Sequence, residues 1–412
     1  MPDGGLDVAI VGGGIGGLTL ALMLHASGRP YRVRVYEAVP EIKALGVGIN
    51  IQAHAMRELA ALGLEDALRR VSVEPKEQLF FSHHGQLIYQ EPAGVAAGSP
   101  YPHFSIHRGE LHIVLLDAVR ARLGPDAVVT GHRCVLAEQT DDGVVLHFTD
   151  PAGVALEPVR ADLAIACDGI NSTLRAQFYP HEGAPVYHGI NMWRGVTRAK
   201  PFLGGRSATR IGGLQTTNKM VVYPIRDDID GAGNQLINWV AEAVTNLRES
   251  VDWSRSGRLE DFYHFYAGWT FDWLDVAALI RDAEFILSYP MVDRDPIERW
   301  SFGRITLLGD AAHPMYPRGG NGAAQAIVDA RTIVDMLASH ADPVAALAAD
   351  EAARLPATSK IVLMNREAPP DLIIDTVERL TGGQRFENID DVIDRAELKA
   401  IADAYHHATA VR

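Results

Sequence analysis

Cysteine, positive charge and long apolar runs are all scarce in this sequence. Only two of its 412 residues are cysteines, Cys134 and Cys167. Each lies in or beside an apolar run typical of a strand, which predicts buried free thiols and argues against a disulfide framework or a metal site. Acidic residues outnumber basic residues by 52 to 38, so the formal net charge is −14. This balance argues against nucleic acid and anionic membranes as partners.

Apolar segments in the chain are short. None reaches the ~20 consecutive residues needed to cross a bilayer. The first apolar run begins within a glycine motif and has no basic region before it, unlike a signal peptide. We therefore expect a soluble, cytoplasmic protein with no membrane partner. Hydrophobic residues make up 47% of the chain and charged residues 22%, which is ordinary for a globular protein, and the length predicts about two domains.

The N-terminal stretch after Asp7 has the pattern of a dinucleotide-binding unit. An apolar run that reads as a buried strand is followed by Gly12, Gly14 and Gly17 in the order G-x-G-x-x-G, and then by an apolar helix. In such a unit Gly12 makes the tight turn, Gly14 lets the backbone approach a pyrophosphate, and Gly17 lets helix and strand pack closely. Glu37, twenty residues past Gly17 and after a second strand-like run, is placed to bind a ribose. A Gly-rich turn of another α/β unit is the alternative.

The middle of the chain predicts a second domain inserted into the first. Residues 78–82 and 86–90 flank His83-His84-Gly85 as the two strands of a β-hairpin. Strand-like runs then follow at 192–197, 208–211, 220–225, 236–241 and 284–287, and a Trp- and Tyr-rich stretch at 258–281 reads as helical. Such a succession of strands with a helical cover is typical of an antiparallel sheet.

The α/β pattern returns at residues 305–310, and helices are predicted at 323–339 and 345–368. We therefore predict an α/β fold, α+β overall, in which residues 1–180 and 291–345 form a Rossmann-like dinucleotide-binding domain. Residues 181–290 are expected to form the inserted antiparallel sheet, which would bind the substrate. Residues 346–412 are expected to form a C-terminal helical region.

Two further motifs lie far from the glycine motif in the chain. The first is Asp168-Gly-Ile-Asn-Ser172-Thr-Leu-Arg175, of the form D-G-x-x-S-x-x-R. The second is Gly309-Asp310-Ala-Ala-His313-Pro-Met-Tyr-Pro317, of the form G-D-A-A-H-x-x-x-P, and it is followed by Gly320-Asn-Gly322. With the glycine motif, they make residues 7 to about 340 resemble the FAD-dependent aromatic hydroxylases. These are single-component flavoprotein monooxygenases with the para-hydroxybenzoate hydroxylase fold.

Four shorter segments resemble one branch of that family. They are Leu45-Gly-Val-Gly-Ile-Asn-Ile-Gln, Ser105-Ile-His-Arg-Gly-Glu-Leu, Met192-Trp-Arg-Gly-Val-Thr and Tyr289-Pro-Met-Val-Asp-Arg-Asp-Pro. They are similar to the phenazine-modifying enzymes of the 5-methylphenazine-1-carboxylate 1-monooxygenase kind. Those enzymes replace a ring carboxylate by a hydroxyl group, using FAD, NADH and O₂.

The resemblance implies FAD as the cofactor, no metal, and a set of residues that bind FAD. These are Gly12, Gly14, Ile15, Gly16, Gly17, Glu37, Ala38, Gly46, Val47, Gly48, Arg108, Cys134, Asp168, Asp310, Gly320, Asn321 and Gly322. Asp310, at the end of a strand, can accept a hydrogen bond from a ribityl hydroxyl. The glycines and helix N-terminus after it can stabilise negative charge on reduced flavin. Arg108 is expected to pair with the pyrophosphate or ribityl chain, and Cys134 to flank the adenine through its main chain.

The resemblance also implies the reaction. FAD, reduced by NADH or NADPH, takes up O₂ as a C4a-hydroperoxide and hydroxylates an aromatic or heteroaromatic carboxylate such as a phenazine, with or without decarboxylation. The chain has no second G-x-G-x-x-G, so we expect NAD(P)H to bind transiently at the surface. The choices between NADH and NADPH, and between monomer and homodimer, stay open.

Five residues are candidates for the chemistry or for substrate binding. Tyr223, Pro317 and His313 are the catalytic candidates, and Tyr223, Arg194 and Arg318 the substrate-binding ones. Tyr223 is expected to hydrogen-bond a ring substituent and the two arginines a carboxylate, with sheet packing and structural salt bridges as the alternatives. We expect His313 to shape the flavin loop and Pro317 to border the place of oxygen transfer. A cation at position 318, where an apolar residue would also fit, departs from the relatives. It could help to bind an anionic substrate, and it leaves open whether that substrate is the same as theirs.

Two other functions are compatible with the same fold. A flavin halogenase would carry a Trp-x-Trp-x-Ile signature, which is absent from the sequence. A non-catalytic FAD-binding redox sensor or scaffold is the second alternative, and the three intact motifs argue against it.

Overall fold

A six-stranded sheet is the framework of the first part of the molecule. The computed structural model describes residues 5–245, 255–367 and 369–409. The strand order is β20-β21-β12-β1-β2-β8, and all neighbours are parallel except β20 and β21. The strands are β1 (Leu6–Val11), β2 (Tyr31–Tyr36), β8 (Val128–Val129), β12 (Leu163–Ala166), β20 (Ser301–Phe302) and β21 (Ile305–Leu307).

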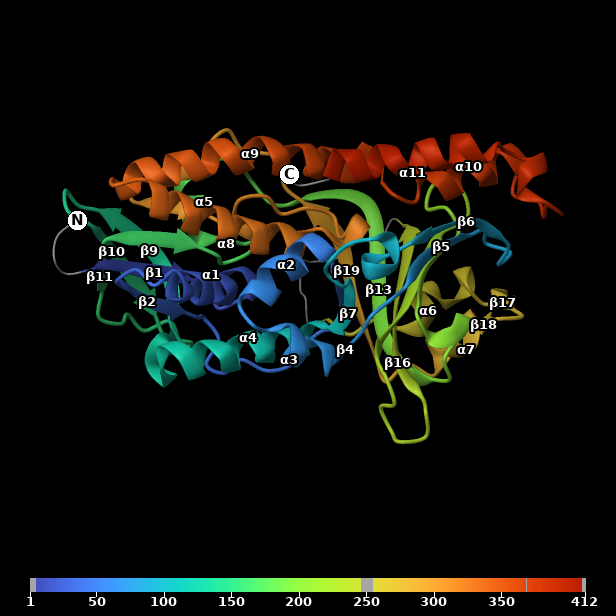
Figure 1. Ribbon diagram of the computed structural model, residues 1–412, viewed down its shortest axis with the longest axis horizontal. Coiled ribbons are helices and arrows are strands. Elements are labelled where there is room, and N and C mark those ends of the chain that lie inside the picture. Colours follow the sequence, from blue (N-terminus) through green and yellow to red (C-terminus); the bar gives the residue numbers. More distant parts are fainter. Residues whose placement is uncertain (1–4, 246–254, 368, 410–412) are drawn as a thin grey trace.

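The composition of β1 explains why this sheet is covered on both faces. Val8 and Ile10 pack with helices on one face, and Ala9 and Val11 pack with a small sheet on the other. The helices are α1 (Ile15–Ala26), α4 (Arg108–Leu123) and α8 (Gly322–Ser339), and the small sheet consists of β9 (Arg133–Gln139), β10 (Val144–Thr149) and β11 (Val159–Ala161). Helix α1 contacts both α4 and α8 (Figure 1), so its apolar residues are buried around its whole circumference.

A short antiparallel sheet connects this part of the molecule to a larger one. It is formed by β3 (Gly48–Ile51), β7 (Phe104–His107) and β4 (Ser72–Val73), with α2 (Ala53–Ala61) and α3 (Glu65–Arg69) nearby. Strands β4 and β7 contact β15 of the larger sheet. The loop before β3 is therefore held between the two sheets.

The larger sheet has seven strands in the order β19-β13-β16-β15-β14-β5-β6. They are β5 (Glu77–Phe81), β6 (Leu87–Pro92), β13 (Val186–Ala199), β14 (Ser207–Ile211), β15 (Lys219–Arg226), β16 (Gln235–Val244) and β19 (Phe285–Asp293). The strands predicted between residues 192 and 287 are confirmed. The predicted hairpin at 78–90 is confirmed as β5 and β6, and it joins this sheet through a parallel pairing of β5 with β14. The domain boundaries at 180, 290 and 345 stay a prediction.

The cover of the large sheet differs from the continuous helix predicted at 258–281. It consists of α6 (Leu259–Phe262), the hairpin strands β17 (Thr270–Phe271) and β18 (Leu274–Asp275), and α7 (Val276–Arg281). The Phe262 ring stacks on Trp193 and Trp239 of the sheet, and Tyr266 lies edge-on to Phe262. The spacing of these aromatic residues thus reflects packing on the sheet, because the Phe262 ring lies against two strand tryptophans and the Tyr266 hydroxyl lies within hydrogen-bonding distance of strand carbonyls.

Three helices complete the chain. They are α9 (Pro343–Glu367), α10 (Leu372–Thr381) and α11 (Arg395–Thr409), and Figure 1 shows them along one side of the molecule. The helices predicted at 323–339 and 345–368 are confirmed as α8 and α9, which pack together, except that residue 368 lies outside the described residues. Short 3-10 turns occur at Gly94–Ala97, Pro125–Ala127, Leu203–Gly205, Tyr263–Phe265, Gly309–Ala311, Arg318–Gly320 and Ile389–Asp391. Within the described part of the chain, each helix is too short or too polar to span a bilayer.

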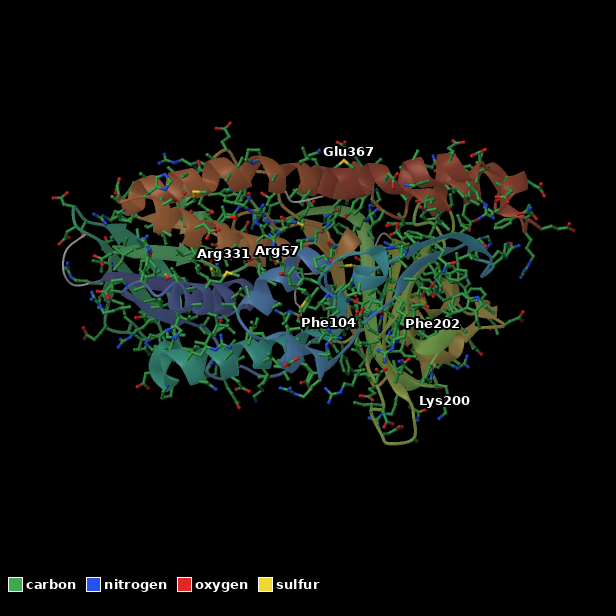
Figure 2. All side chains as sticks on the ribbon, in the orientation of Figure 1. Arg57, Phe104, Lys200, Phe202, Arg331 and Glu367 are labelled. Atoms are coloured by element: carbon green, nitrogen blue, oxygen red, sulfur yellow. The ribbon has the colours of Figure 1, made fainter. Side chains whose placement is uncertain are left out.

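The two parts of the molecule have separate cores. Phe104 belongs to the core between the six-stranded sheet and its helices, and Phe202 to the core under the large sheet; both are labelled in Figure 2. The space between the two cores is where the sequence motifs lie.

Candidate functional site

The three sequence motifs meet at one edge of the six-stranded sheet. Strands β21, β12 and β1 are parallel neighbours, so the residues that follow their carboxyl ends lie side by side. These residues are Leu308, Cys167 and Gly12. A cavity of about 640 Å³ opens at this edge, between the motif loops and the inner face of the large sheet.

The glycine loop has the geometry that its sequence predicts. Gly12 adopts a φ of +106°, and a Cβ atom there would lie 2.4 Å from the carbonyl oxygen of Cys167. A Cβ atom on Gly17 would lie 2.1 Å from the carbonyl oxygen of Gly12, so only glycine lets α1 start this close to the strand. Around Gly14, in contrast, no described atom lies within 4 Å of a Cβ position, and this residue lines the cavity. The open space at Gly14 belongs to the cavity, so a pyrophosphate bound there could approach the backbone closely.

Glu37 supports the glycine loop from outside the cavity lining. Its carboxylate accepts hydrogen bonds from the backbone N–H of Gly13 at 2.7 Å and of Val39 at 3.0 Å. Ala38, the next residue, also lies outside the lining. The predicted contact of Glu37 with a ribose stays a prediction, because a carboxylate can accept further hydrogen bonds beside these two.

The two cysteines are in different environments. Both are free, and Cys134 is buried under the sheet, where burial and the nearby Asp168 raise the pKa of its thiol to about 12. Cys167 is partly exposed and lines the cavity. Burial also raises the pKa of the Cys167 thiol well above its ordinary value. The prediction of buried free thiols is therefore confirmed, although the turn after β12 leaves part of Cys167 open to the cavity.

The Asp168 motif holds two loops together. The Asp168 carboxylate accepts a hydrogen bond from the N–H of Thr173 at 2.8 Å, and its other oxygen, Oδ1, is buried with no partner among the described residues. Burial raises the pKa of Asp168, although Ser172 and Thr173 oppose the rise. Arg175, in contrast, points away from the cavity and donates to the carbonyl oxygens of Ala311 and Ala312 at 3.1 and 2.7 Å.

Arg175 was visible in the sequence as a motif residue, but its partners were not. It is 1% exposed and pairs with Glu182. Because its guanidinium binds the carbonyls of the third motif, the second motif fixes the position of the third.

Asp310 faces the cavity with an accessible carboxylate. It lies in the 3-10 turn that follows β21 and lines the cavity together with Arg108. Its Oδ1 would lie 3.9 Å from a Cβ atom on Gly322, the first residue of α8. Burial of the carboxylate within the cavity raises the pKa of Asp310 above its ordinary value, while His313 and Arg108 oppose the rise. The first residues of α8 and of α1 also line the cavity, so the positive ends of two helices meet there.

His313 lies behind this wall and supports it. Its Nε2 atom is 2.6 Å from Oδ2 of Asp329 on α8, and the same oxygen accepts a hydrogen bond from the N–H of Gly309 at 3.2 Å. Arg354 donates to the other oxygen of Asp329 at 2.7 Å. Burial opposes ionisation of Asp329, but His313 and Arg354 outweigh it and hold its pKa at about 2. His313 does not line the cavity, which agrees with a shaping role for the loop.

Residues 46–48 form the wall opposite Asp310, and the large sheet holds them. The carbonyl oxygen of Gly48 accepts hydrogen bonds from the Tyr223 hydroxyl at 2.9 Å and from Arg194 at 2.5 Å, and its N–H donates to Asn238 at 2.7 Å. A Cβ atom on Gly48 would lie 2.7 Å from Asn238, so the close approach needs glycine. Tyr223 and Arg194 line the cavity, but their hydrogen bonds serve this loop.

The loop after Pro317 is held by the C-terminal helix. Tyr405 of α11 accepts a hydrogen bond from Asn321 at 2.8 Å, and its hydroxyl donates to the carbonyl oxygen of Arg318 at 3.3 Å. Pro317, Gly320 and Gly322 line the cavity, whereas Arg318 and Asn321 do not. The Arg318 guanidinium is buried and donates to the carbonyl oxygen of Asn365 at 3.2 Å. We therefore do not propose Arg318 as a direct substrate ligand.

The inner face of the large sheet supplies the rest of the cavity. Alternate residues of β15, namely Lys219, Val221 and Tyr223, face inward, with Val240 and Glu242 beside them on β16. The same face carries Met192 and Arg194 on β13, Arg210 on β14, and Leu287 and Tyr289 on β19. Three charged residues of this face, Arg210, Lys219 and Glu242, were missed from the sequence. The alternation along β15 was the only signal for Lys219.

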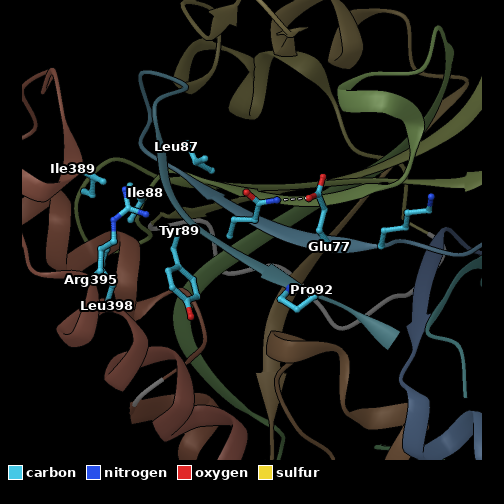
Figure 3. Close-up of a pocket in the computed structure, with 10 residues that line it drawn as sticks. Glu77, Leu87, Ile88, Tyr89, Pro92, Ile389, Arg395 and Leu398 are labelled. Atoms are coloured by element: carbon cyan, nitrogen blue, oxygen red, sulfur yellow. Dashed lines mark hydrogen bonds between the residues drawn. The ribbon is translucent and has the colours of Figure 1, made fainter. Parts of the chain in front are cut away.

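A second cavity, of about 440 Å³, lies apart from this site. Figure 3 shows it between β6 and the C-terminal residues Ile389, Arg395 and Leu398. None of the residues of the three motifs lines it, so it takes no part in the argument for the site.

The residues of the main cavity fit FAD. The open space at Gly14 and the helix N-termini suit a pyrophosphate, and the buried unpartnered Oδ1 of Asp168 and the accessible carboxylate of Asp310 are acceptors for hydroxyl groups. Arg108 faces the same space. When bound there, FAD would supply the electron transfer and oxygen activation that amino-acid side chains cannot perform.

Comparison with known proteins agrees with this geometry. The family described as "FAD binding domain" matches residues 5–194 and 288–363. A phenazine 1,6-dicarboxylic acid hydroxylase, PhzS, of Lysobacter antibioticus is 43% identical over 377 residues, which cover 90% of this chain and 91% of that protein. This chain belongs to the FAD-dependent aromatic hydroxylases. These comparisons confirm the family, the fold class, the FAD cofactor and the monooxygenase activity that the sequence predicts.

Other members of the family are similar to this hydroxylase over most of its length. A 3-amino-4-hydroxybenzoate 2-monooxygenase of Streptomyces cremeus is 32% identical over 366 residues, covering 88% of this chain and 86% of that protein. The structure of Klebsiella pneumoniae HpxO complexed with FAD and uric acid has the same fold, with a TM-score of 0.75 at 23% identity and coverage of 97% and 96%. The fold is thus shared well beyond the range of close sequence similarity.

Gly14 and Gly17 allow a matched test of FAD binding against stability in this hydroxylase. We expect Gly14→Ala to leave stability within about 0.5 kcal/mol but to weaken FAD binding by about 10-fold or more, equivalent to ~1.4 kcal/mol, because the methyl group would enter the open space. We expect Gly17→Ala to lower the free energy of unfolding by about 1–3 kcal/mol through overpacking. Urea unfolding and titration of the apoprotein with FAD measure the two effects. Unchanged FAD affinity in Gly14→Ala would contradict the assignment.

Asp329 allows a second test, of the support behind the flavin loop. We expect Asp329→Asn to lower the free energy of unfolding at pH 7 by about 3 kcal/mol, because Arg354 would lose its buried counter-ion. The folded-state pKa of about 2 lies below the ordinary value, so this stabilisation is present above about pH 4 and declines as the pH falls toward 2. Urea unfolding at several pH values measures both.

The matched control for Asp329 is on the same helix. Asp335 is exposed and pairs with Arg331 at 2.6 Å. We expect Asp335→Asn to change the free energy of unfolding by less than about 0.5 kcal/mol. Equal effects of the two substitutions would show that the buried network does not hold the loop.

Proposed function

We propose that this hydroxylase acts on an aromatic or heteroaromatic carboxylate such as a phenazine carboxylate, with NADH or NADPH as the reductant. One atom of O₂ enters the ring as a hydroxyl group. The other leaves as water, with the two electrons that NAD(P)H gives up on becoming NAD(P)⁺. If the hydroxyl group replaces the carboxylate, the carboxylate leaves as CO₂.

The observation that carries this proposal is the shape and polarity of the sheet face in the cavity. Val221 and Val240 form an apolar strip in its middle, with Arg194 beside Val240 and Arg210 beside Val221. Tyr223 lies toward one end of this face, and Lys219 and Glu242 lie toward the other. The four residue steps from Lys219 to Tyr223 span about 13 Å. This length suits a fused three-ring system that carries a carboxylate better than a single ring.

The printed names of the relatives support an anionic aromatic substrate. The Lysobacter protein is named for a phenazine dicarboxylic acid and the Streptomyces protein for an aminohydroxybenzoate. The apolar strip would exclude water from the ring, which protects the oxygen transfer from wasteful side reactions. Tyr223 and Arg194 would act on the reaction through Gly48, by positioning the loop that faces the ring system of FAD.

A direct test supplies purified, FAD-loaded protein with NADH or NADPH, O₂ and phenazine-1-carboxylate. We expect the ligand to accelerate NAD(P)H oxidation and to gain one hydroxyl group per NAD(P)H consumed. With ¹⁸O₂, the product should carry one labelled oxygen, because the hydroxyl oxygen comes from O₂ and not from water. Mass spectrometry of the product also distinguishes simple hydroxylation from replacement of the carboxylate.

Other outcomes would favour the alternative functions. Acceleration by a single-ring acid but not by the phenazine would contradict the three-ring assignment. A flavin that NAD(P)H cannot reduce, whichever aromatic acid is present, would favour the redox sensor or scaffold. A halogenated product formed in the presence of chloride or bromide would favour a halogenase.

A further inference from the structure

Arg210 is a cation on the sheet face of the cavity whose side-chain hydrogen-bonding capacity is unused among the described residues. It lies on β14 opposite Val221 of β15, and its side chain lines the cavity. No hydrogen bond from its guanidinium to another residue is observed in the described chain. Its contacts are Oδ1 of Asp371 at 3.8 Å and the ring of Phe80, whose centroid lies 6.0 Å away. A guanidinium has five N–H donors arranged as a fork that matches a carboxylate.

Lys219, the neighbouring cation, is already engaged. Its Nζ atom lies 3.2 Å from both carboxylate oxygens of Glu242 and 3.2 Å from Oδ1 of Asp371. It is 1% exposed. Tyr266 holds the backbone of both strands at this point, because its hydroxyl lies 3.0 Å from the carbonyl oxygen of Lys219 and 2.8 Å from that of Glu242. The Lys219 amino group is therefore shared between two carboxylates, whereas Arg210 makes no hydrogen bond to either of them.

Asp371, at the start of α10, forms no hydrogen bond with the Arg210 guanidinium. Its Oδ1 forms the ion pair with Lys219, and its Oδ2 is buried without a hydrogen-bonded partner among the described residues. Burial opposes its ionisation, but Lys219, Arg318 and Arg210 outweigh this and lower its pKa. At 3.8 Å from Arg210 the pair is too long for the bidentate geometry that a carboxylate and a guanidinium prefer. Arg210 therefore lies beside the apolar strip and has no carboxylate as a bidentate partner among the described residues.

We propose that Arg210 is the residue that binds a carboxylate of the substrate and so determines its specificity, a role for which the sequence offered Arg194 and Arg318. This inference rests on the proposed function, because it assumes an aromatic acid as substrate. With the rings against Val221 and Val240, a carboxylate on the ring edge reaches the guanidinium from the cavity side. Lys219, Arg318 and Arg210 together carry three positive charges against the two negative charges of Glu242 and Asp371, so the local charge favours an incoming anion.

The test compares an acid with its neutral amide. The FAD-loaded protein is titrated with phenazine-1-carboxylate and with phenazine-1-carboxamide, and binding is followed by the change in flavin absorbance. We expect Arg210→Gln to weaken binding of the acid by about 10- to 100-fold, the usual range for a lost charge-assisted hydrogen-bonded pair. Binding of the amide should change by less than about 3-fold, and Arg210→Lys should retain part of the affinity for the acid.

The control and the contrary outcomes separate this inference from the proposed function. Arg206, just before β14, pairs with Asp227 at 2.7 Å outside the cavity, so Arg206→Gln should bind both ligands as wild type does. Equal affinity of wild type and Arg210→Gln for the acid would overturn the inference. So would equal loss of acid and amide binding in both Arg210 variants, which would indicate a structural role. A wild-type protein that binds neither ligand and is stimulated by no aromatic acid would overturn the proposed function as well.

Discussion

The contact between Arg175 and the third motif is the interaction on which the site depends. The cavity is built from loops about 140 residues apart in the chain, and backbone pairing of β12 with β21 ends just before them. Arg175 continues the connection past the end of the sheet by donating to the carbonyls of Ala311 and Ala312. Asp329 completes it from behind, with His313 and Arg354 as its partners. Because the Arg175 guanidinium and the Asp329 carboxylate are both buried, the two loops have little freedom to move apart.

This rigid wall explains how the two parts of the molecule share one cavity. The large sheet reaches across to the flavin loop through Gly48, whose carbonyl and N–H are both bound by sheet residues. The C-terminal helices contribute from the opposite side, Tyr405 at the loop after Pro317 and Asp371 at the charged end of the sheet face. The FAD motifs and the sheet face are therefore walls of the same cavity, so cofactor and substrate can meet without a large rearrangement.

The sequence predicted the FAD side of the site better than the substrate side, for a physical reason. Gly12, Gly14 and Gly17 act through backbone geometry that one short segment determines, and parallel strand order brings Asp168 and Asp310 to the same edge. Arg210 meets Lys219 only because β14 pairs with β15 in one register and with β5 from far earlier in the chain. Asp371, which also contacts both residues, lies at the start of α10, about 150 residues further along the chain. The aromatic segment at 258–281, predicted to be helical, is helical only at its two ends, because a short hairpin of β17 and β18 interrupts it.

A crystal structure of the protein with FAD and phenazine-1-carboxylate bound would test most directly whether the three motifs and the sheet face form one site. The account predicts the pyrophosphate beside Gly14, the rings of the ligand against Val221 and Val240, and its carboxylate within hydrogen-bonding distance of Arg210. A carboxylate bound to Arg194 instead, or a ligand seated in the cavity between β6 and the C-terminal helices, would contradict it.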